Sequence, residues 1–153
     1  MALAADLLGW QGPVLNWQGD EPLLRADDAL AAVALLERFA VGTLAAPFRG
    51  DAEDRNRVKV QRAADGEALD FSRAPFAGGG PALEHVGVYA YRADALEAWV
   101  AAPPALREEE ESLEQLRAQA AGIRIGVALI AAAPPGVNVP QDIDRVRPLL
   151  RSD

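Results

Sequence analysis

Hydrophobic and polar positions along the chain follow two patterns, one typical of strands and one typical of helices. Short apolar or alternating runs, bounded by glycine, proline and acidic residues, predict strands at residues 14–18, 41–48, 57–62, 67–72, 85–92 and 123–130. Apolar residues spaced three and four apart predict helices at residues 1–9, 26–39, 94–100, 107–121 and 140–150. The helix at 107–121 is the clearest of these, and Gly122 follows it as a natural C-terminal stop.

The order of these segments predicts the fold class. Strands alternate with helices along most of the chain, which is typical of an α/β protein. The exception is the pair of strands at 57–62 and 67–72, which a turn around Asp65 and Gly66 joins as a β-hairpin. We therefore expect a single domain over residues 1–153, built as a mixed sheet with one hairpin and flanked by helices.

The composition narrows the classes of partner and of site. The chain has 15 basic and 23 acidic residues, and its net charge of −8 argues against nucleic acid or an anionic membrane as a partner. Because it has no cysteine and one histidine, His85, a disulfide framework, a thiolate nucleophile and a multi-histidine metal site are excluded. No apolar run reaches the length of a membrane span, so we expect a cytoplasmic protein.

Five sequence motifs follow one another along the chain. They are VLNWQGDEPLL at 14–24, RVKVQRAADGEALDFSRAPF at 57–76, HVGVYAYR at 85–92, ESLEQLR at 111–117 and PPGVNVPQDIDRV at 134–146. Together they resemble CMP-Kdo synthetase, the 3-deoxy-manno-octulosonate cytidylyltransferase, over residues 14–146. The resemblance implies a Rossmann-like nucleotidyltransferase fold and enzymes that couple CTP to a sugar acid with the help of magnesium.

Two features depart from the pattern of that family. The resemblance implies that an N-terminal third with the loop for the CTP phosphates is absent, and a chain with one lysine and a charge of −8 has little to neutralise a triphosphate. The two metal-binding aspartates of the family correspond to Asp20 and Asn138, so the second position lacks a carboxylate. We therefore expect no catalytic residue and no cofactor, except that magnesium is implied if a second chain supplies the CTP site.

The part of the family that contacts the sugar acid is retained. By resemblance, the positions that contact the sugar are Arg73, His85, Tyr89, Glu114 and Gln115. Their chemistry fits a small acidic ligand, because arginine pairs with a carboxylate while histidine, glutamate and glutamine hold hydroxyl groups. The residues alone also allow plainer interpretations, in which His85 is a strand-end histidine satisfied by backbone and Arg73 forms a surface ion pair.

The acidic segments have plain interpretations too. Asp20, Glu21 and Pro22 are expected to form an acidic turn rather than half of a metal site. The glutamate run at 108–111 is expected to be a solvated helix start at the positive end of the helix dipole. The corresponding motif of the family that the chain resembles has a histidine between its glutamates, and this chain has none there.

The strand predicted at 14–18 is the candidate for binding a partner. In the sheet of the family the absent strands lie beside this one, so an open edge is expected at Val14, Leu15, Asn16, Trp17 and Gln18. Three covers are considered for this edge: the helix at 1–9, a second copy of the chain, or a peptide from a partner protein.

We predict a non-catalytic binding protein, derived from a sugar-acid cytidylyltransferase, that recognises a peptide or partner protein at this edge in a bacterial biosynthetic pathway. A small acidic ligand is the second candidate, and the resemblance implies a homodimer. The alternative function is one half of a split CMP-sugar synthetase, with a separate CTP-binding subunit. A third interpretation is a gene fragment that folds without a role.

Overall fold

One six-stranded sheet organises the protein. The computed structural model describes residues 1–153 except 2–4, 6–8, 78–82, 138 and 152–153. The strands are β1 (Val14–Trp17), β2 (Val41–Pro47), β3 (Lys59–Arg62), β4 (Ala68–Ser72), β5 (Leu83–Tyr91) and β6 (Ile125–Leu129). Their order is β4-β3-β5-β2-β6, with β1 paired to β5 beside this path. Since β2 and β6 are parallel and the other pairs antiparallel, the predicted mixed sheet and its hairpin, β3-β4, are confirmed.

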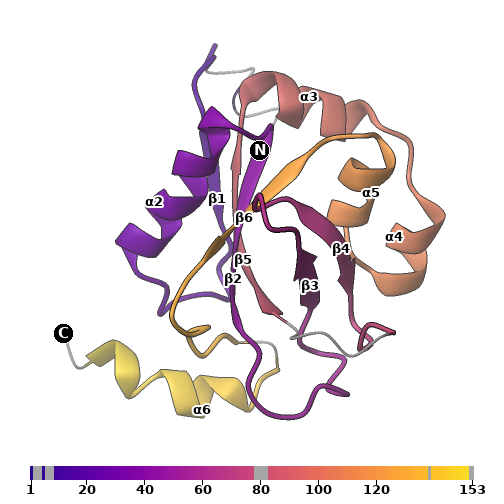
Figure 1. The fold of residues 1–153 in the computed structure, drawn as a ribbon. Helices are drawn as coiled ribbons and strands as arrows, with labels where there is room; N and C mark the ends of the chain where they lie inside the picture. Colours follow the sequence, from indigo (N-terminus) through magenta and orange to yellow (C-terminus); the bar gives the residue numbers. More distant parts are fainter. Residues whose placement is uncertain (2–4, 6–8, 78–82, 138, 152–153) are drawn as a thin grey trace.

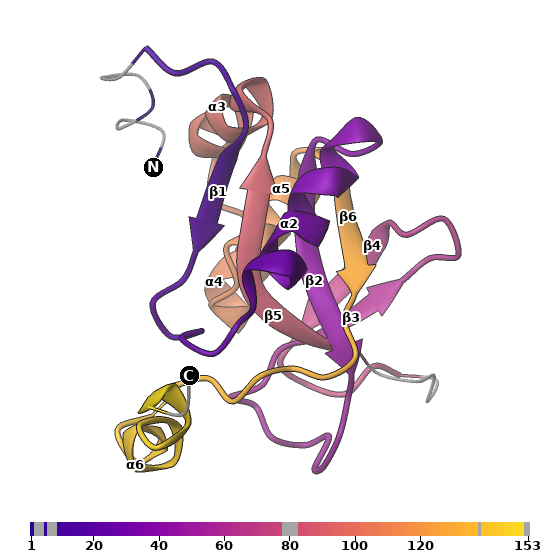
Figure 2. The same cartoon turned by 90° about the vertical axis from the view of Figure 1, so that its left-hand side faces the viewer.

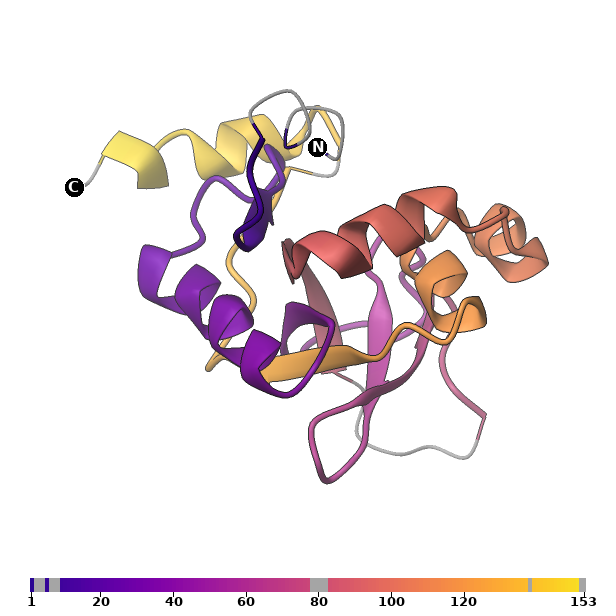
Figure 3. The same cartoon turned by 90° about the horizontal axis from the view of Figure 1, so that it is seen from above.

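Helices cover both faces of the sheet (Figures 1 and 3). One face is covered by α2 (Ala26–Ala34), which a 3-10 turn at Leu35–Glu37 continues. The other face carries α3 (Ala93–Ala101), α4 (Leu106–Glu111) and α5 (Gln115–Ala120). Beyond the end of the sheet lie α6 (Asp142–Val146) and a 3-10 turn at Leu149–Arg151 (Figure 2).

The helix predicted at 107–121 is wrong in one respect, because the structure divides it into α4 and α5 at Ser112. This residue has a left-handed backbone, with φ 52° and ψ 52°. Its carbonyl accepts a hydrogen bond from Arg73 Nη2 at 3.3 Å. The break makes Gln115 the first residue of a separate short helix rather than the middle of a long one.

The glutamate run at 108–111 is only partly solvated, which corrects the expectation of a solvated helix start. Glu108 is buried, and its Oε2 accepts a hydrogen bond from Arg117 Nε at 2.8 Å. The carboxylate of Glu111 accepts a hydrogen bond from the backbone N–H of Arg73 at 3.0 Å. Two of the four glutamates are therefore tied into the fold.

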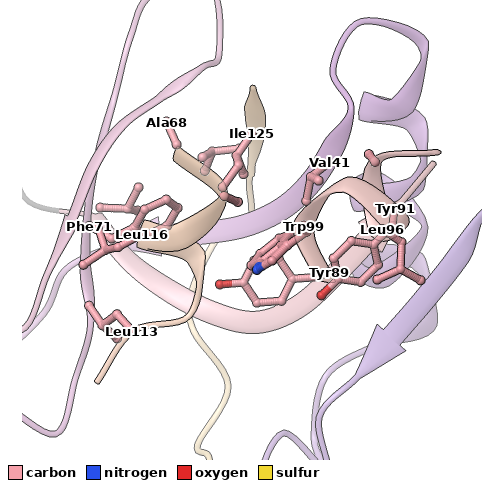
Figure 4. Packing of buried hydrophobic residues seen from close by; sticks show 14 of the residues in the cluster. Val41, Ala68, Phe71, Tyr89, Tyr91, Leu96, Trp99, Leu113, Leu116 and Ile125 are labelled. Atoms are coloured by element: carbon pink, nitrogen blue, oxygen red, sulfur yellow. The ribbon is translucent and has the colours of Figure 1, made fainter. Parts of the chain in front are cut away.

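A row of aromatic rings links β5 to α3 in the core (Figure 4). The rings of Tyr89 and Trp99 meet edge to face, with their centroids 5.9 Å apart, and Tyr91 meets Trp99 in the same way at 5.5 Å. His85 continues this row, since its ring centroid lies 5.2 Å from that of Tyr89. The predicted alternation along β5 thus brings three ring-bearing residues to one face of the strand.

Two expectations are not settled by this architecture. Residues 2–4 and 6–8 of the helix predicted at 1–9 lie outside the described residues, so cover of the sheet edge by this segment stays a prediction. Among the residues that are described, no helix combines the length and apolar character needed to cross a membrane. The cytoplasmic location also stays a prediction.

Candidate functional site

A cleft opens on the edge of β5 that β1 and β3 share. β1 pairs with residues 88–91 of β5, and β3 pairs with residues 83 and 84 on the same edge. Between these contacts, at residues 85–87, the two strands diverge. The space between them is a cleft of about 410 Å³, which Trp99 of α3 and residues 112–115 at the start of α5 also line.

A β-bulge in β5 shapes the floor of this cleft. Thr43 of β2 pairs with Tyr89, but the next residue, Leu44, pairs with Val86, so β5 has two extra residues at this point. One of them is Gly87, whose backbone N–H is turned to a side chain, Glu21 Oε1, at 3.1 Å. The backbone N–H of Gly87 is therefore bonded to a side chain at the cleft and not to a neighbouring strand.

All five residues predicted to contact a sugar acid line this cleft. They come from three parts of the fold: Arg73 follows β4, His85 and Tyr89 lie on β5, and Glu114 and Gln115 lead into α5. The structure brings the five together although they are far apart in the sequence. Their role as ligand contacts stays a prediction.

Three polar groups in the cleft have no hydrogen-bond partner among the described residues: the side-chain amide of Gln115, the hydroxyl of Tyr89 and Nδ1 of His85. Gln115 is 6% exposed and Tyr89 is 5% exposed, and burial raises the pKa of Tyr89 well above its usual 10. In the described part of the chain every fully inaccessible side-chain nitrogen or oxygen has a partner, so these three groups reach the open space of the cleft. Unpaired polar groups on nearly buried side chains indicate that a ligand or water completes them.

Arg73 is held by backbone carbonyls and forms no ion pair within the described residues, which differs from its interpretation as a surface ion pair. Its Nε donates to Glu111 O at 2.8 Å, Nη1 to Arg55 O at 3.1 Å and Nη2 to Ser112 O at 3.3 Å. A guanidinium group has five N–H donors, so two remain, and no described carboxylate neutralises its charge. Arg73 therefore adds a fixed positive charge to the wall of the cleft.

His85 is held by a side chain rather than by backbone alone. Its Nε2 lies 2.9 Å from Thr43 Oγ1, and its ring meets the edge of Phe71 at a centroid distance of 5.4 Å. Burial lowers the pKa of His85 to about 4, so the imidazole is neutral at pH 7. A neutral ring presents one donor and one acceptor nitrogen.

Sequence reasoning missed the role of Glu21, which lies on the β1 side of the cleft. Glu21 accepts a hydrogen bond from Gly87, and burial raises the pKa of Glu21 to about 7. The segment is therefore more than a plain acidic turn. The ion pair of Arg57 with Glu84, with Nε 2.6 Å from Oε1, was missed as well and lines the β3 side. A glycine inside an otherwise apolar strand, Gly87, is the signal that points to both the bulge and the glutamate beside it.

Of the two positions at which the resemblance places the metal-binding aspartates of the family, the structure describes one. Asp20 lines the cleft, and its backbone carbonyl accepts a hydrogen bond from Val137 N–H at 2.8 Å, which brings the segment before Asn138 next to Asp20. Asn138 itself lies outside the described residues. Within the described ranges, no three His, Cys, Asp or Glu side chains are grouped to hold a metal ion.

β1 lies at an edge of the sheet, where it pairs only with β5 among the described strands. Gln18 N–H bonds to Gly87 O, so the alternation of an antiparallel ladder turns the N–H groups of Leu15 and Trp17 to the open side. Both side chains are 40% exposed. The Trp17 indole is nevertheless held, because its Nε1 donates to Glu21 O at 2.8 Å.

Comparison with known proteins identifies close relatives of the chain. Residues 10–125 match the protein family described as cytidylyltransferase. A 3-deoxy-manno-octulosonate cytidylyltransferase of Xanthomonas campestris pv. campestris (strain B100) is 43% identical over 173 residues, covering 99% of this chain and 62% of the relative. A protein of the same name from Azorhizobium caulinodans is 44% identical over 149 residues, covering 92% of this chain and 60% of the relative. The chain thus spans less than two thirds of the length of these relatives.

Solved structures show the same fold. A structure of CMP:2-keto-3-deoxy-manno-octonic acid synthetase complexed with CTP matches with a TM-score of 0.88 and 34% identity, over 97% of this chain and 65% of that one. A protein described as a glucose-1-phosphate thymidylyltransferase from Bacillus anthracis, in complex with sucrose, matches with a TM-score of 0.66 at 13% identity, which shows the fold alone. The nucleotidyltransferase-like fold and the resemblance to CMP-Kdo synthetase are therefore confirmed. The chain belongs to the cytidylyltransferase family.

Proposed function

We propose that the cleft binds a sugar acid of the 3-deoxy-manno-octulosonate type, and that the chain carries the sugar-acid half of a cytidylyltransferase. The observation that carries the proposal is Gln115, a nearly buried residue whose amide ends in the cleft with no hydrogen bond to the described chain. The hydroxyl of Tyr89 and Nδ1 of His85 likewise have no hydrogen bond to the described chain. A sugar acid supplies several hydroxyl groups that match such atoms.

The charges of the cleft support an acidic ligand at one side. Glu84 neutralises the positive charge of Arg57, whereas the guanidinium of Arg73 is hydrogen-bonded only to carbonyl groups among the described residues. Arg73 therefore supplies the charge that a carboxylate requires. The relatives described above are named for 3-deoxy-manno-octulosonate, which is a sugar acid.

The proposal includes a non-catalytic role for the chain on its own. Asn138 stands where the resemblance places the second metal-binding aspartate, and an asparagine lowers the charge available to magnesium by one unit. In the alternative function, a separate subunit provides the CTP site, and this chain binds the sugar acid to which CMP is transferred.

Calorimetry with 3-deoxy-manno-octulosonate, alone and with CTP and magnesium ions, tests the cleft. We expect the sugar acid to bind, and Gln115→Leu to weaken binding about tenfold or more, because one buried hydrogen bond to the ligand is lost. The matched control is Gln141→Leu, an exposed glutamine outside the cleft, which should bind like the unaltered chain. Absence of binding in every condition, with the fold intact by circular dichroism, would reject the proposal. Release of pyrophosphate from CTP would reject the non-catalytic part.

A second candidate function is peptide binding at β1, which the outward N–H groups and exposed side chains of Leu15 and Trp17 favour. Leu15→Pro removes an outward N–H while it leaves the ladder to β5 intact. If a peptide from a neighbouring gene binds the unaltered chain, the variant should lose that binding and keep its circular dichroism spectrum. Equal binding by both would exclude the edge.

A further inference from the structure

Thr43 connects the bulge of β5 to the only histidine of the chain. It lies in β2 with no exposed surface, directly before the register shift between β2 and β5. Its Oγ1 donates to the backbone carbonyl of Val88, one of the two extra residues of the bulge, at 2.7 Å. The same oxygen lies 2.9 Å from His85 Nε2.

This arrangement determines which nitrogen of His85 carries the proton. A hydroxyl group has one proton, and the Val88 carbonyl can only accept it. Toward His85, Thr43 Oγ1 is therefore an acceptor, so Nε2 must be the donor. The opposite tautomer would place two lone pairs against each other at hydrogen-bond distance.

The other nitrogen is consequently an acceptor that faces the cleft. Among the described residues none donates to Nδ1, and His85 lines the cleft. The ring is neutral at pH 7, since burial lowers the pKa of His85 to about 4. Nδ1 thus presents a lone pair to whatever occupies the cleft.

We infer that Thr43 is a positioning residue that holds His85 as the Nε2–H tautomer, so that Nδ1 accepts a hydrogen bond from a hydroxyl group of the ligand. The identity of that ligand rests on the proposed function, but the tautomer does not. A carboxylate cannot take this place, because its oxygens only accept hydrogen bonds. The acidic end of a sugar acid must therefore bind away from His85, and the hydroxyl-bearing part must bind against it.

Nitrogen-15 NMR of the imidazole tests the tautomer without any ligand. Because His85 is the only histidine, its ring resonances are unambiguous. At neutral pH we expect a protonated Nε2 and an unprotonated Nδ1. Thr43→Val, which keeps the shape but removes the hydroxyl, should give a mixture of both tautomers. Thr43→Ser, which keeps the hydroxyl, should show the Nε2–H tautomer alone. A protonated Nδ1 in the unaltered chain, which needs no variant to fold, would overturn the inference, as would an unchanged tautomer in folded Thr43→Val.

Calorimetry then separates this inference from the proposed function. Thr43→Val should bind 3-deoxy-manno-octulosonate about tenfold more weakly, and Thr43→Ser should recover most of the affinity. If the unaltered chain binds no sugar acid while NMR shows the expected tautomer, the proposed ligand fails and the role of Thr43 stands. If it binds and Thr43→Val binds equally well, acceptance of a ligand hydroxyl by His85 is refuted.

Discussion

The guanidinium of Arg73 donates a hydrogen bond to the carbonyl of Ser112, the residue at which the backbone turns left-handed and separates α4 from α5. Arg73 also holds the carbonyls of Arg55 and Glu111. One side chain therefore joins the end of β4, the segment before β3 and the corner that leads to Gln115. Arg73 therefore has a structural role that neither sequence interpretation, the ligand contact or the surface ion pair, includes.

Replacing Arg73 by lysine should destabilise the fold. Lysine keeps the charge but has no planar fork to reach three carbonyls, so the free energy of unfolding should fall by about 2 kcal/mol. Urea unfolding measures this change. The exposed Arg55 makes no side-chain hydrogen bond or ion pair within the described residues, so Arg55→Lys is the matched control and should be neutral. Equal effects of the two substitutions would show that the carbonyl contacts contribute nothing.

Removing the charge of Glu108 should destabilise the fold in a pH-dependent way. Hydrogen bonds from Arg117 lower the pKa of Glu108 below its ordinary 4.5. The stability that this group contributes is present above 4.5 and is lost as pH falls through the lower pKa of the folded state. Glu108→Gln should therefore be less stable than the unaltered chain at neutral pH, and the difference should shrink in acid.

Thermal unfolding at several pH values checks this expectation. The control is Glu109→Gln, because Glu109 is exposed on the same helix and should show no such difference. A gap between Glu108→Gln and the unaltered chain that stays constant from neutral pH into acid would contradict the account.

Alanine at two glycines of the sheet should have different consequences. A Cβ at Gly42 would overlap the backbone carbonyl of Ala32, which cannot move away, so Gly42→Ala should cost about 1–3 kcal/mol of stability. A Cβ at Gly87 would overlap the far end of the flexible Gln18 side chain and would lie in ordinary contact with Glu21 Cγ, at 3.5 Å. Gly87→Ala should therefore change stability by less than about 1 kcal/mol but weaken sugar-acid binding, because Gln18 lines the cleft. Urea unfolding measures the stability of both variants, and calorimetric titration measures their sugar-acid binding. An equal loss of stability in the two variants would contradict this prediction.

The titration of His85 should lie far below that of a free histidine. Burial lowers the pKa of His85 from 6.5 to about 4, so the folded state resists its protonation. The unfolded chain binds that proton more readily, and the stability that depends on neutral His85 should fall as pH drops from 6.5 toward 4. Proton NMR of the imidazole follows the titration directly. A midpoint near 6.5 in the folded protein would contradict the burial of this ring.

The strands and the hairpin can be predicted from the sequence because their patterns are local. The contact at the Ser112 break cannot, since Arg73, which bonds to the Ser112 carbonyl, lies 39 positions away. The same holds for Thr43 and His85, which are 42 positions apart, and for Glu21 and Gly87, which are 66 apart. Motif resemblance indicates the residues that line the cleft, but not the partners that hold them, because those partners meet only when β1, β2 and β5 assemble.

The central claim is that the cleft between β1 and β3 is the binding site for a sugar acid. Amide NMR of the isotope-labelled chain, titrated with 3-deoxy-manno-octulosonate in the presence of CTP and magnesium ions, tests it most directly. The account predicts that the backbone signals of His85, Gly87 and Gln115 shift together and saturate, while those of Leu15 stay in place. Shifts gathered on residues 14–17, or none at a large excess of the sugar acid, would contradict it.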